Sequence, residues 1–324
     1  MANVNDAISR FPRAKAPARP SRVLKDAGSR RAGPLGRGTR FVLSALFLFG
    51  SCARGDRIVV GAKNFTESDL LAEIVAQQIE RRTGLPVGRK LHLGGTFVCD
   101  RAIKSGDIDL YVEYTGTAYT AVLNHSPGPS ADSVYQAVAE EYRRRWGLIW
   151  TAPFGFNNTF AVAVRQAAAD SHGLRTISDL ARIAPRWKAG FGYEFLNRAD
   201  GFTGLSTVYG LKFSTPPTAM ALGLTYRALA EGQVDVIAGN STDGQLEALH
   251  LVALEDDRHY FPPYEAAPVV RGPVLERHPA VQRALAELAG RIDDAEMRRL
   301  NALADVEHRD LREIARDWLA RALP

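Results

Sequence analysis

The sequence predicts an α/β protein made of two similar lobes with a ligand cleft between them. Its 324 residues are too many for one small core, and 46% hydrophobic with 24% charged residues is ordinary for a globular protein. A strand, a short loop and a helix follow one another from residue 57, and a unit of helix, glycine and strand occurs twice.

The first 52 residues differ in composition from the rest of the chain. They contain ten Lys or Arg and two Asp or Glu, a balance of +8, whereas the remainder contains 31 basic and 34 acidic residues. The body is therefore mildly acidic, and the basic character belongs to a leader. The apolar run at 41–49 is too short to span a bilayer but matches the hydrophobic region of a signal peptide.

Small residues directly before Cys52 resemble a bacterial lipobox, in which Cys52 would be lipidated and become the mature N-terminus. Phe49 departs from that pattern, because Leu, Val or Ile is usual there. We predict export to the periplasm or to the outer face of the cytoplasmic membrane. A start codon downstream of Met1 and a cytosolic protein with a basic tail are the alternatives. Cys99 is the other cysteine, and we expect it to be a small buried hydrophobe without a disulfide.

Residues 57–61 form the first predicted strand, and a helix follows with apolar side chains at helical spacing from Leu70 to Ile79. Thr66 and Asp69 predict a capping box at its start, and Gly84 predicts its end.

Residues 102–117 and 228–243 align without gaps at an offset of 126 residues. Gly106 aligns with Gly232, and Asp109 aligns with Asp235. Each segment predicts the end of a helix, a glycine turn and a buried strand, so we interpret the pair as an internal repeat of two α/β lobes. A chance likeness between two joints of this common kind is the alternative.

Two segments suit crossings between the lobes. One is 152–164, where Gly155 and two asparagines interrupt a strand, and the other is 254–264, which ends near two prolines. We predict a leader at 1–52, lobe I at 54–153 and 257–324, and lobe II at 154–256. The helical pattern of 279–322 is expected to pack on the outside of lobe I.

The sequence gives no support for catalysis or for a cofactor. It has no paired-Cys or H-E-x-x-H metal pattern, no Gly-rich nucleotide-binding loop and no G-x-S-x-G elbow. We therefore predict that the protein is not an enzyme and binds neither a metal nor nucleic acid. An enzyme that uses the cleft and a sensory ligand-binding module are the alternatives in other classes.

Aromatic residues recur at strand ends and crossings, where ligands bind in open α/β sheets. They are Phe65, Tyr114, Phe160, Phe202 and Tyr264. A quaternary ammonium has no N–H to donate and is recognised by aromatic faces, at roughly 0.5 to 2 kcal/mol per ring. The carboxylate of a zwitterion would suit the free N–H groups of the helix that begins at Thr66.

Several motifs, in order, resemble the substrate-binding proteins of quaternary-amine ABC importers, the glycine betaine/choline/carnitine osmoprotectant family. They are VGAKNFTE at 60–67, LGGT at 93–96, SGDIDLYVEYTGT at 105–117, GFNNT at 155–159, NRADG at 197–201 and PPYEAAPVVR at 262–271. The resemblance covers residues 57 to about 320.

This resemblance implies a two-lobe periplasmic-binding-protein fold of type II, with two crossovers, that closes on its ligand by a hinge. It implies an aromatic cage at Tyr114, Phe160, Asn240 and Tyr264, with Thr117 beside the ligand, and Asn157 in the GFNNT motif is a further candidate ligand-binding residue. It also implies a small-molecule solute, an ABC permease as partner, and a receptor that we expect to be a monomer.

Two cage positions depart from the family pattern. Phe160 replaces a tyrosine, which keeps the aromatic face and loses a hydroxyl, and Asn240 replaces another aromatic residue, which removes one wall. Either the site binds trimethylammonium compounds less tightly, or Asn240 makes a hydrogen bond and the specificity has shifted to another small zwitterion.

Overall fold

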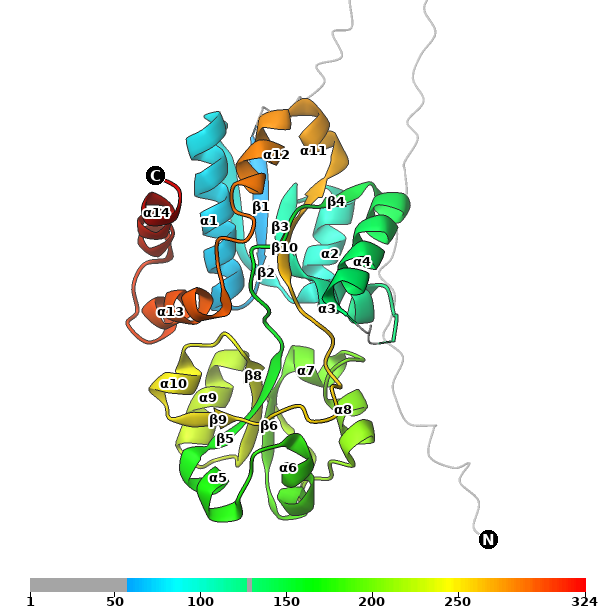
Figure 1. Cartoon of the computed structure of the whole chain (residues 1–324), viewed down its shortest axis with the longest axis vertical. Coiled ribbons are helices and arrows are strands. Elements are labelled where there is room, and N and C mark those ends of the chain that lie inside the picture. The colour runs from blue at the N-terminus through cyan, green and yellow to red at the C-terminus, as the bar shows by residue number, and fades with distance from the viewer. Residues whose placement is uncertain (1–56, 127–129) are drawn as a thin grey trace, which may run out of the picture. The chain divides into compact units, whose positions relative to one another are not determined.

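The computed structural model describes residues 57–126 and 130–324 (Figure 1). The predicted leader at 1–52 and the predicted lipidation site Cys52 lie outside these residues. None of the helices that the structure describes has both the length and the apolar composition of a membrane span.

Two five-stranded sheets have the same internal order. The first is β2 (Val87–Gly94), β1 (Ile58–Lys63), β3 (Leu110–Tyr114), β10 (Ala266–Arg271) and β4 (Leu148–Trp150). The second is β7 (Thr218–Met220), β6 (Ala189–Gly192), β8 (Val236–Asn240), β5 (Phe160–Arg165) and β9 (Leu251–Ala253). In each sheet the first three strands are parallel, and the fourth is antiparallel to both of its neighbours. We call each sheet with its packed helices a lobe.

Helices cover both faces of each sheet (Figure 1). The first lobe contains α1 (Thr66–Thr83), α2 (Thr96–Ser105), α3 (Thr115–Thr117), the π-helical turn η1 (Ala118–Val122), α4 (Ala131–Trp146), α11 (Gly272–Arg277), α12 (Pro279–Ala286), α13 (Asp294–Asp305) and α14 (Leu311–Ala322). The second lobe contains α5 (Gln166–His172), α6 (Ile177–Ile183), the 3₁₀ turn η2 (Ala184–Arg186), α7 (Tyr193–Asn197), α8 (Phe202–Tyr209), α9 (Leu222–Ala230) and α10 (Gln245–Ala248).

The internal repeat is a structural repeat. Helices α2 and α9 end before Gly106 and Gly232, whose φ angles are +81° and +72°, and the strands β3 and β8 follow. The two aligned aspartates have the same role, because Asp109 accepts a hydrogen bond from the backbone N–H of Val59 at 2.9 Å and Asp235 accepts one from Lys188 at 2.9 Å. The predicted unit of helix, glycine and strand is confirmed in both copies.

The predicted helix after the first strand is confirmed, and Gly84 ends it at φ +69°. The predicted capping box is wrong. Phe65 occupies the N-cap position, and no side chain makes a capping hydrogen bond at this end of the helix. The hydroxyl of Thr66 instead donates to Asp305 at 2.6 Å, because α13 packs close to this end of α1.

The two segments that join the lobes run side by side. The first lies between β4 and β5, the second between β9 and β10, and Asn157 forms a β-bridge with Glu265 between them. Tyr264 N–H donates to the side-chain oxygen of Asn157 at 2.6 Å, and Asn158 N–H donates to the Tyr264 carbonyl at 3.0 Å. Helices α12 and α14 pack on α1, whereas α13 also contacts α10 of the second lobe.

Candidate ligand-binding cleft

A cleft of about 570 Å³ is lined by side chains of both lobes. It lies at the carboxyl ends of β1, β3, β6 and β8, which is the edge where ligands bind in open α/β sheets. Seven of the nine predicted ligand-binding residues line it, and they are Phe65, Thr66, Tyr114, Thr117, Phe160, Asn240 and Tyr264.

Four aromatic rings of the cleft lie in two pairs. The ring centroids of Phe65 and Tyr114 are 6.2 Å apart, and those of Phe160 and Tyr264 are 5.9 Å apart. The Arg198 guanidinium lies 5.1 Å from the Phe160 ring centroid and 5.9 Å from that of Tyr264. The rings of Phe160 and Tyr264 thus already face a cation that belongs to the protein, the guanidinium of Arg198.

Two predicted residues do not line this cleft. Phe202 packs in the second lobe, with its ring centroid 5.1 Å from that of Phe191 and 5.9 Å from that of Phe213. Asn157 lies on the first crossing segment and lines a second pocket.

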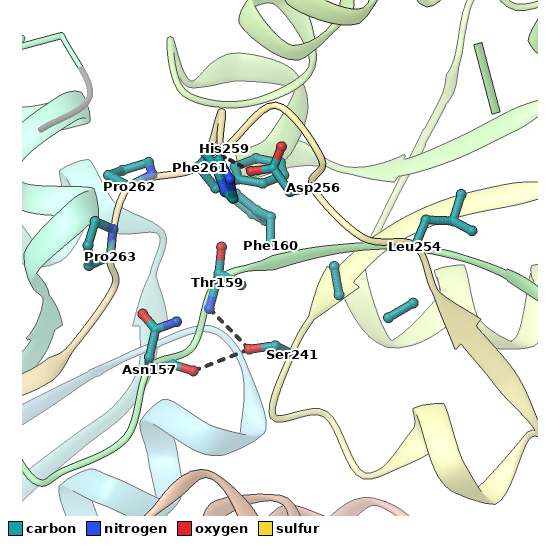
Figure 2. A pocket seen from close by; sticks show the side chains of 12 residues that line it. Asn157, Thr159, Phe160, Ser241, Leu254, Asp256, His259, Phe261, Pro262 and Pro263 are labelled. Atoms are coloured by element: carbon teal, nitrogen blue, oxygen red, sulfur yellow. Dashed lines mark hydrogen bonds between the residues drawn. The ribbon is translucent and has the colours of Figure 1, made fainter. Parts of the chain in front are cut away.

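That second pocket, of about 760 Å³, is formed where the two crossing segments meet (Figure 2). Ser241 links two residues of the pocket wall. The Oγ of Ser241 accepts a hydrogen bond from Thr159 N–H at 3.1 Å and donates one to the Asn157 carbonyl at 3.2 Å. One carboxylate lines this pocket, that of Asp256, and it accepts hydrogen bonds from the backbone N–H groups of Tyr260 and Phe261. We favour the smaller cleft as the ligand site because it combines several rings with buried cations.

Acidic residues lie at the start of α1, where a ligand carboxylate is predicted to bind. Its first turn already contains Glu67 and Asp69, and the hydroxyl of Ser68 accepts a hydrogen bond from Lys63 N–H at 2.8 Å. Asp69 accepts from His92 N–H at 2.8 Å. Two acidic residues thus lie in the first turn of α1, but no side chain makes a capping hydrogen bond there, and the carboxylate site at this helix start stays a prediction.

Buried cations in the cleft were missed by the sequence reasoning. Lys63 is 4% exposed and pairs with Glu113, and its Nζ lies 4.9 Å from the Tyr114 ring centroid. Arg198 is 7% exposed and pairs with Asp200, to which its Nε donates at 2.9 Å. Both cations line the cleft. Both cations belong to motifs that carry the family resemblance, VGAKNFTE and NRADG, and this position in a motif could have marked them as candidate site residues.

Arg198 also organises the ring beside it. Burial opposes ionisation of Asp200, but the guanidinium of Arg198 holds the pKa of that carboxyl below its usual value. Asp200 in turn accepts a hydrogen bond from the Tyr264 hydroxyl at 2.6 Å. The pair of Arg198 and Asp200 therefore holds the Tyr264 ring in place, and the guanidinium of Arg198 lies at the surface of the cleft.

Asn240 is tied to a neighbouring carboxyl. Its side-chain amide lies 3.3 Å from Asp243 Oδ2, and its backbone N–H donates to the same atom at 2.9 Å. Tyr226 also donates to Asp243. Burial raises the pKa of Asp243 to about 7, while these hydrogen bonds oppose the rise. The position that lacks an aromatic wall is therefore polar and hydrogen-bonded.

Glu67 connects the cleft to both lobes. Its carboxyl is buried and accepts from the Tyr114 hydroxyl at 2.6 Å, from Asn158 at 2.7 Å, from Thr242 at 2.5 Å and from Asn301 at 2.7 Å. Burial raises the pKa of Glu67, and the four donated bonds oppose the rise. One side chain thus joins an aromatic residue of the cleft, the first crossing segment, the second lobe and α13.

The comparison with protein families decides the identity. A family model described as the substrate binding domain of the ABC-type glycine betaine transport system matches residues 56–321. The chain belongs to this family.

Individual members of the glycine betaine transport family agree over most of the chain. A glycine-betaine-binding protein of Pseudomonas aeruginosa is 36% identical, covering 85% of this chain and 91% of its own length. The carnitine transport binding protein OpuCC of Listeria monocytogenes is 32% identical, covering 86% and 92%. A crystal structure described as a glycine betaine/carnitine/choline ABC transporter has a TM-score of 0.69 at 30% identity, covering 82% of this chain and 98% of that one.

Membership of the glycine betaine transport family confirms the predicted fold and functional class. The two sheets and two crossings are the two-lobe periplasmic-binding-protein fold of type II. The family is one of substrate-binding proteins of transporters. Within residues 57–126 and 130–324, no three His, Cys, Asp or Glu side chains gather as a metal site requires.

Proposed function

We propose that this chain is the extracytoplasmic receptor of an ABC importer, which binds a small quaternary-ammonium or zwitterionic solute of the glycine betaine, choline or carnitine type and delivers it to the permease. The observation that carries the proposal is the pairing, in one cleft, of aromatic faces with buried cations. Aromatic faces suit an ammonium group, and buried cations suit a carboxylate.

The proposed contacts divide by chemistry. The ammonium group contacts the rings of Tyr114, Phe160 and Tyr264, and Phe65 packs behind Tyr114. Three rings at roughly 0.5 to 2 kcal/mol each contribute roughly 2 to 6 kcal/mol. A carboxylate of the solute binds Arg198, because among the described residues no hydrogen bond occupies Nη1 of that guanidinium. Thr117 stands beside the solute.

The remaining predicted ligand residues take other parts in this proposal. Thr66 lines the cleft but donates to Asp305. Asn157 supports Tyr264 from the crossing segment, and Phe202 supports the second lobe from its core. We assign neither of these last two residues to ligand contact.

A second candidate is a receptor of the same fold whose specificity has moved to another small zwitterion. Asn240 and Asp243 favour it, because they place an amide and a carboxyl where the family has an aromatic wall. Such a wall would take a ligand with polar groups at that end.

The substitution Asn240→Tyr separates the two candidates. If the site is an incomplete cage for quaternary amines, a restored ring adds roughly 1 to 2 kcal/mol and tightens glycine betaine binding about five- to thirtyfold. Calorimetric titration measures the change. Unchanged or abolished betaine binding would favour the polar wall and the shifted specificity. Phe160→Tyr, which restores a hydroxyl without adding a ring, is the matched control.

The cellular setting follows from the same proposal. The receptor acts as a monomer in the periplasm or on the outer face of the cytoplasmic membrane, contacts the transmembrane subunits of the permease, and does not catalyse a reaction or bind nucleic acid. If Cys52 is acylated, the lipid anchors it to the membrane. Mass spectrometry of the mature N-terminus, compared with a Cys52→Ser variant, tests that anchor.

A further inference from the structure

An unassigned polar position lies in the cleft where α2 begins. Thr96 is the first residue of α2 and is 1% exposed. Its Oγ1 is buried and has no hydrogen-bond partner in the part of the chain that the structure describes. Thr96 lines the cleft. Since a buried hydroxyl without a partner is costly, a group that binds beside it is expected to be polar.

A carboxylate reaches the same place from the other lobe. Glu194 lies on α7 of the second lobe, whereas α2 belongs to the first (Figure 1). A Cβ atom on Gly95 would lie 2.0 Å from Glu194 Oε1, so glycine at that position is what allows the carboxylate to approach. The other oxygen, Oε2, is buried and without a partner among the described residues. Glu194 also lines the cleft, so it and Thr96 are neighbours across it.

The start of α2 favours a carboxylate nearby. No side chain caps this helix, and its first turn contains no acidic residue. The N–H groups at a helix start carry partial positive charge and stabilise a nearby anion. Glu194 therefore supplies, from the opposite lobe, the negative group that α2 lacks.

This polar pair adjoins the rings on both sides. Gly94, two residues before Thr96, pairs in the sheet with Lys63, whose Nζ lies 4.9 Å from the Tyr114 ring centroid. Glu194 precedes Phe195, whose ring centroid is 4.9 Å from that of Phe160. A solute held by the rings could therefore extend a short polar arm toward Thr96 and Glu194.

We propose that Thr96 and Glu194 form a hydroxyl-binding subsite, which selects quaternary-ammonium solutes that carry a hydroxyl group. The solute O–H donates to Glu194 Oε2, and its oxygen accepts from Thr96 Oγ1–H. A hydroxyl satisfies both orphaned atoms, because it is donor and acceptor at once. A second carboxylate would be repelled by Glu194, and a methyl group would leave both atoms unpaired. This inference rests on the proposed function of the cleft and names its substrate class.

Two pairs of solutes isolate the hydroxyl. Carnitine and γ-butyrobetaine differ by one hydroxyl, and so do choline and ethyltrimethylammonium. Titration calorimetry on the purified protein is expected to show that the hydroxylated member of at least one pair binds about tenfold tighter, which corresponds to about 1.4 kcal/mol. In Thr96→Val and Glu194→Gln this preference should fall to within about twofold, while affinity for the member without a hydroxyl changes little.

Control variants separate a subsite from a general loss of fold. Thr96→Ser keeps the hydroxyl and should retain the preference. Thr207→Val and Glu276→Gln, both at exposed positions outside the cleft, should leave every affinity unchanged. Equal affinity within both pairs for the wild-type protein, or a preference that survives in both cleft variants, would overturn the subsite alone. If no quaternary amine binds at millimolar concentration, the proposed function itself fails and the subsite fails with it.

Discussion

At the residue scale, two buried ion pairs set the charge of the cleft. Lys63 and Glu113 are 50 positions apart in sequence, whereas Arg198 and Asp200 are separated by one residue. Breaking a buried pair leaves an uncompensated charge, so each cation is held in place by its partner. The sequence motifs contain these four residues, but their burial depends on packing between distant segments, which no local pattern predicts.

Arg198→Lys tests the proposed carboxylate contact. Lysine keeps the charge beside Asp200 but loses the planar fork of donors. Glycine betaine, which has a carboxylate, should bind about tenfold or more weakly, whereas choline, which has none, should change by less than about threefold. Titration calorimetry with both ligands measures the difference. An equal loss for both ligands would contradict a carboxylate contact.

Asp243 predicts a pH-dependent stability. Its native pKa of about 7 lies above the ordinary value of 3.8, so between these values the native state binds a proton that the unfolded state releases. Stability is therefore expected to fall as pH rises through this window, by up to about 1.4 kcal/mol per pH unit from this group.

Asp243→Asn should flatten that dependence. Urea unfolding of both proteins from pH 4.5 to 8 measures the difference in slope. An unchanged slope in the variant would show that other groups cause the pH dependence. Asp257→Asn, at an exposed carboxyl whose pKa is lowered, is the matched control.

At the element scale, the repeat was the most informative sequence feature. The same glycine turn and the same hydrogen-bonded aspartate occur in both lobes, and Arg271 pairs with Asp109 as Arg165 pairs with Asp235. Periodicity predicted helices and strands well, because apolar side chains had to face a sheet. The capping box failed because the partner of Thr66 is 239 residues away.

Two glycines near α9 predict opposite effects of the same substitution. Gly232 has a φ of +72° with open space around it, so Gly232→Ala should cost about 1 kcal/mol of unfolding free energy through backbone strain alone. Gly223 lies within α9, also in open space, and Gly223→Ala should stabilise by about 0.4 to 1 kcal/mol. Urea denaturation compares the two, and a loss of stability for both would contradict the account of the turn.

At the scale of the whole molecule, Glu67 connects the two lobes. In hinge closure two lobes move relative to one another about a few residues, so contacts that join the lobes without a ligand favour the closed arrangement. Glu67 makes such contacts with Asn158, Thr242 and Asn301 while it holds the hydroxyl of Tyr114. The sequence could not predict this arrangement, because its five members come from five distant segments.

Glu67→Gln should weaken this connection. One carboxylate oxygen becomes an NH₂ group that cannot accept, so at least one buried donor loses its partner. The free energy of unfolding should fall by about 1 to 3 kcal/mol, whereas Glu140→Gln at an exposed position should change it by less than about 0.5 kcal/mol. If urea denaturation shows equal effects of the two substitutions on the free energy of unfolding, the hydrogen bonds of Glu67 contribute no more to stability than an exposed glutamate does.

The central claim is that the cleft between the lobes binds a quaternary amine. Calorimetric titration of the compact unit Ala53–Pro324 with glycine betaine, choline and carnitine, beside a panel of amino acids and other zwitterions, tests it most directly. Binding of at least one quaternary amine in the micromolar range, lost when Tyr114 and Tyr264 are both replaced by alanine in a protein that still folds, is the predicted result. Binding of a different zwitterion alone would move the specificity to the polar wall at Asn240, and no binding of any solute at millimolar concentration would contradict the account.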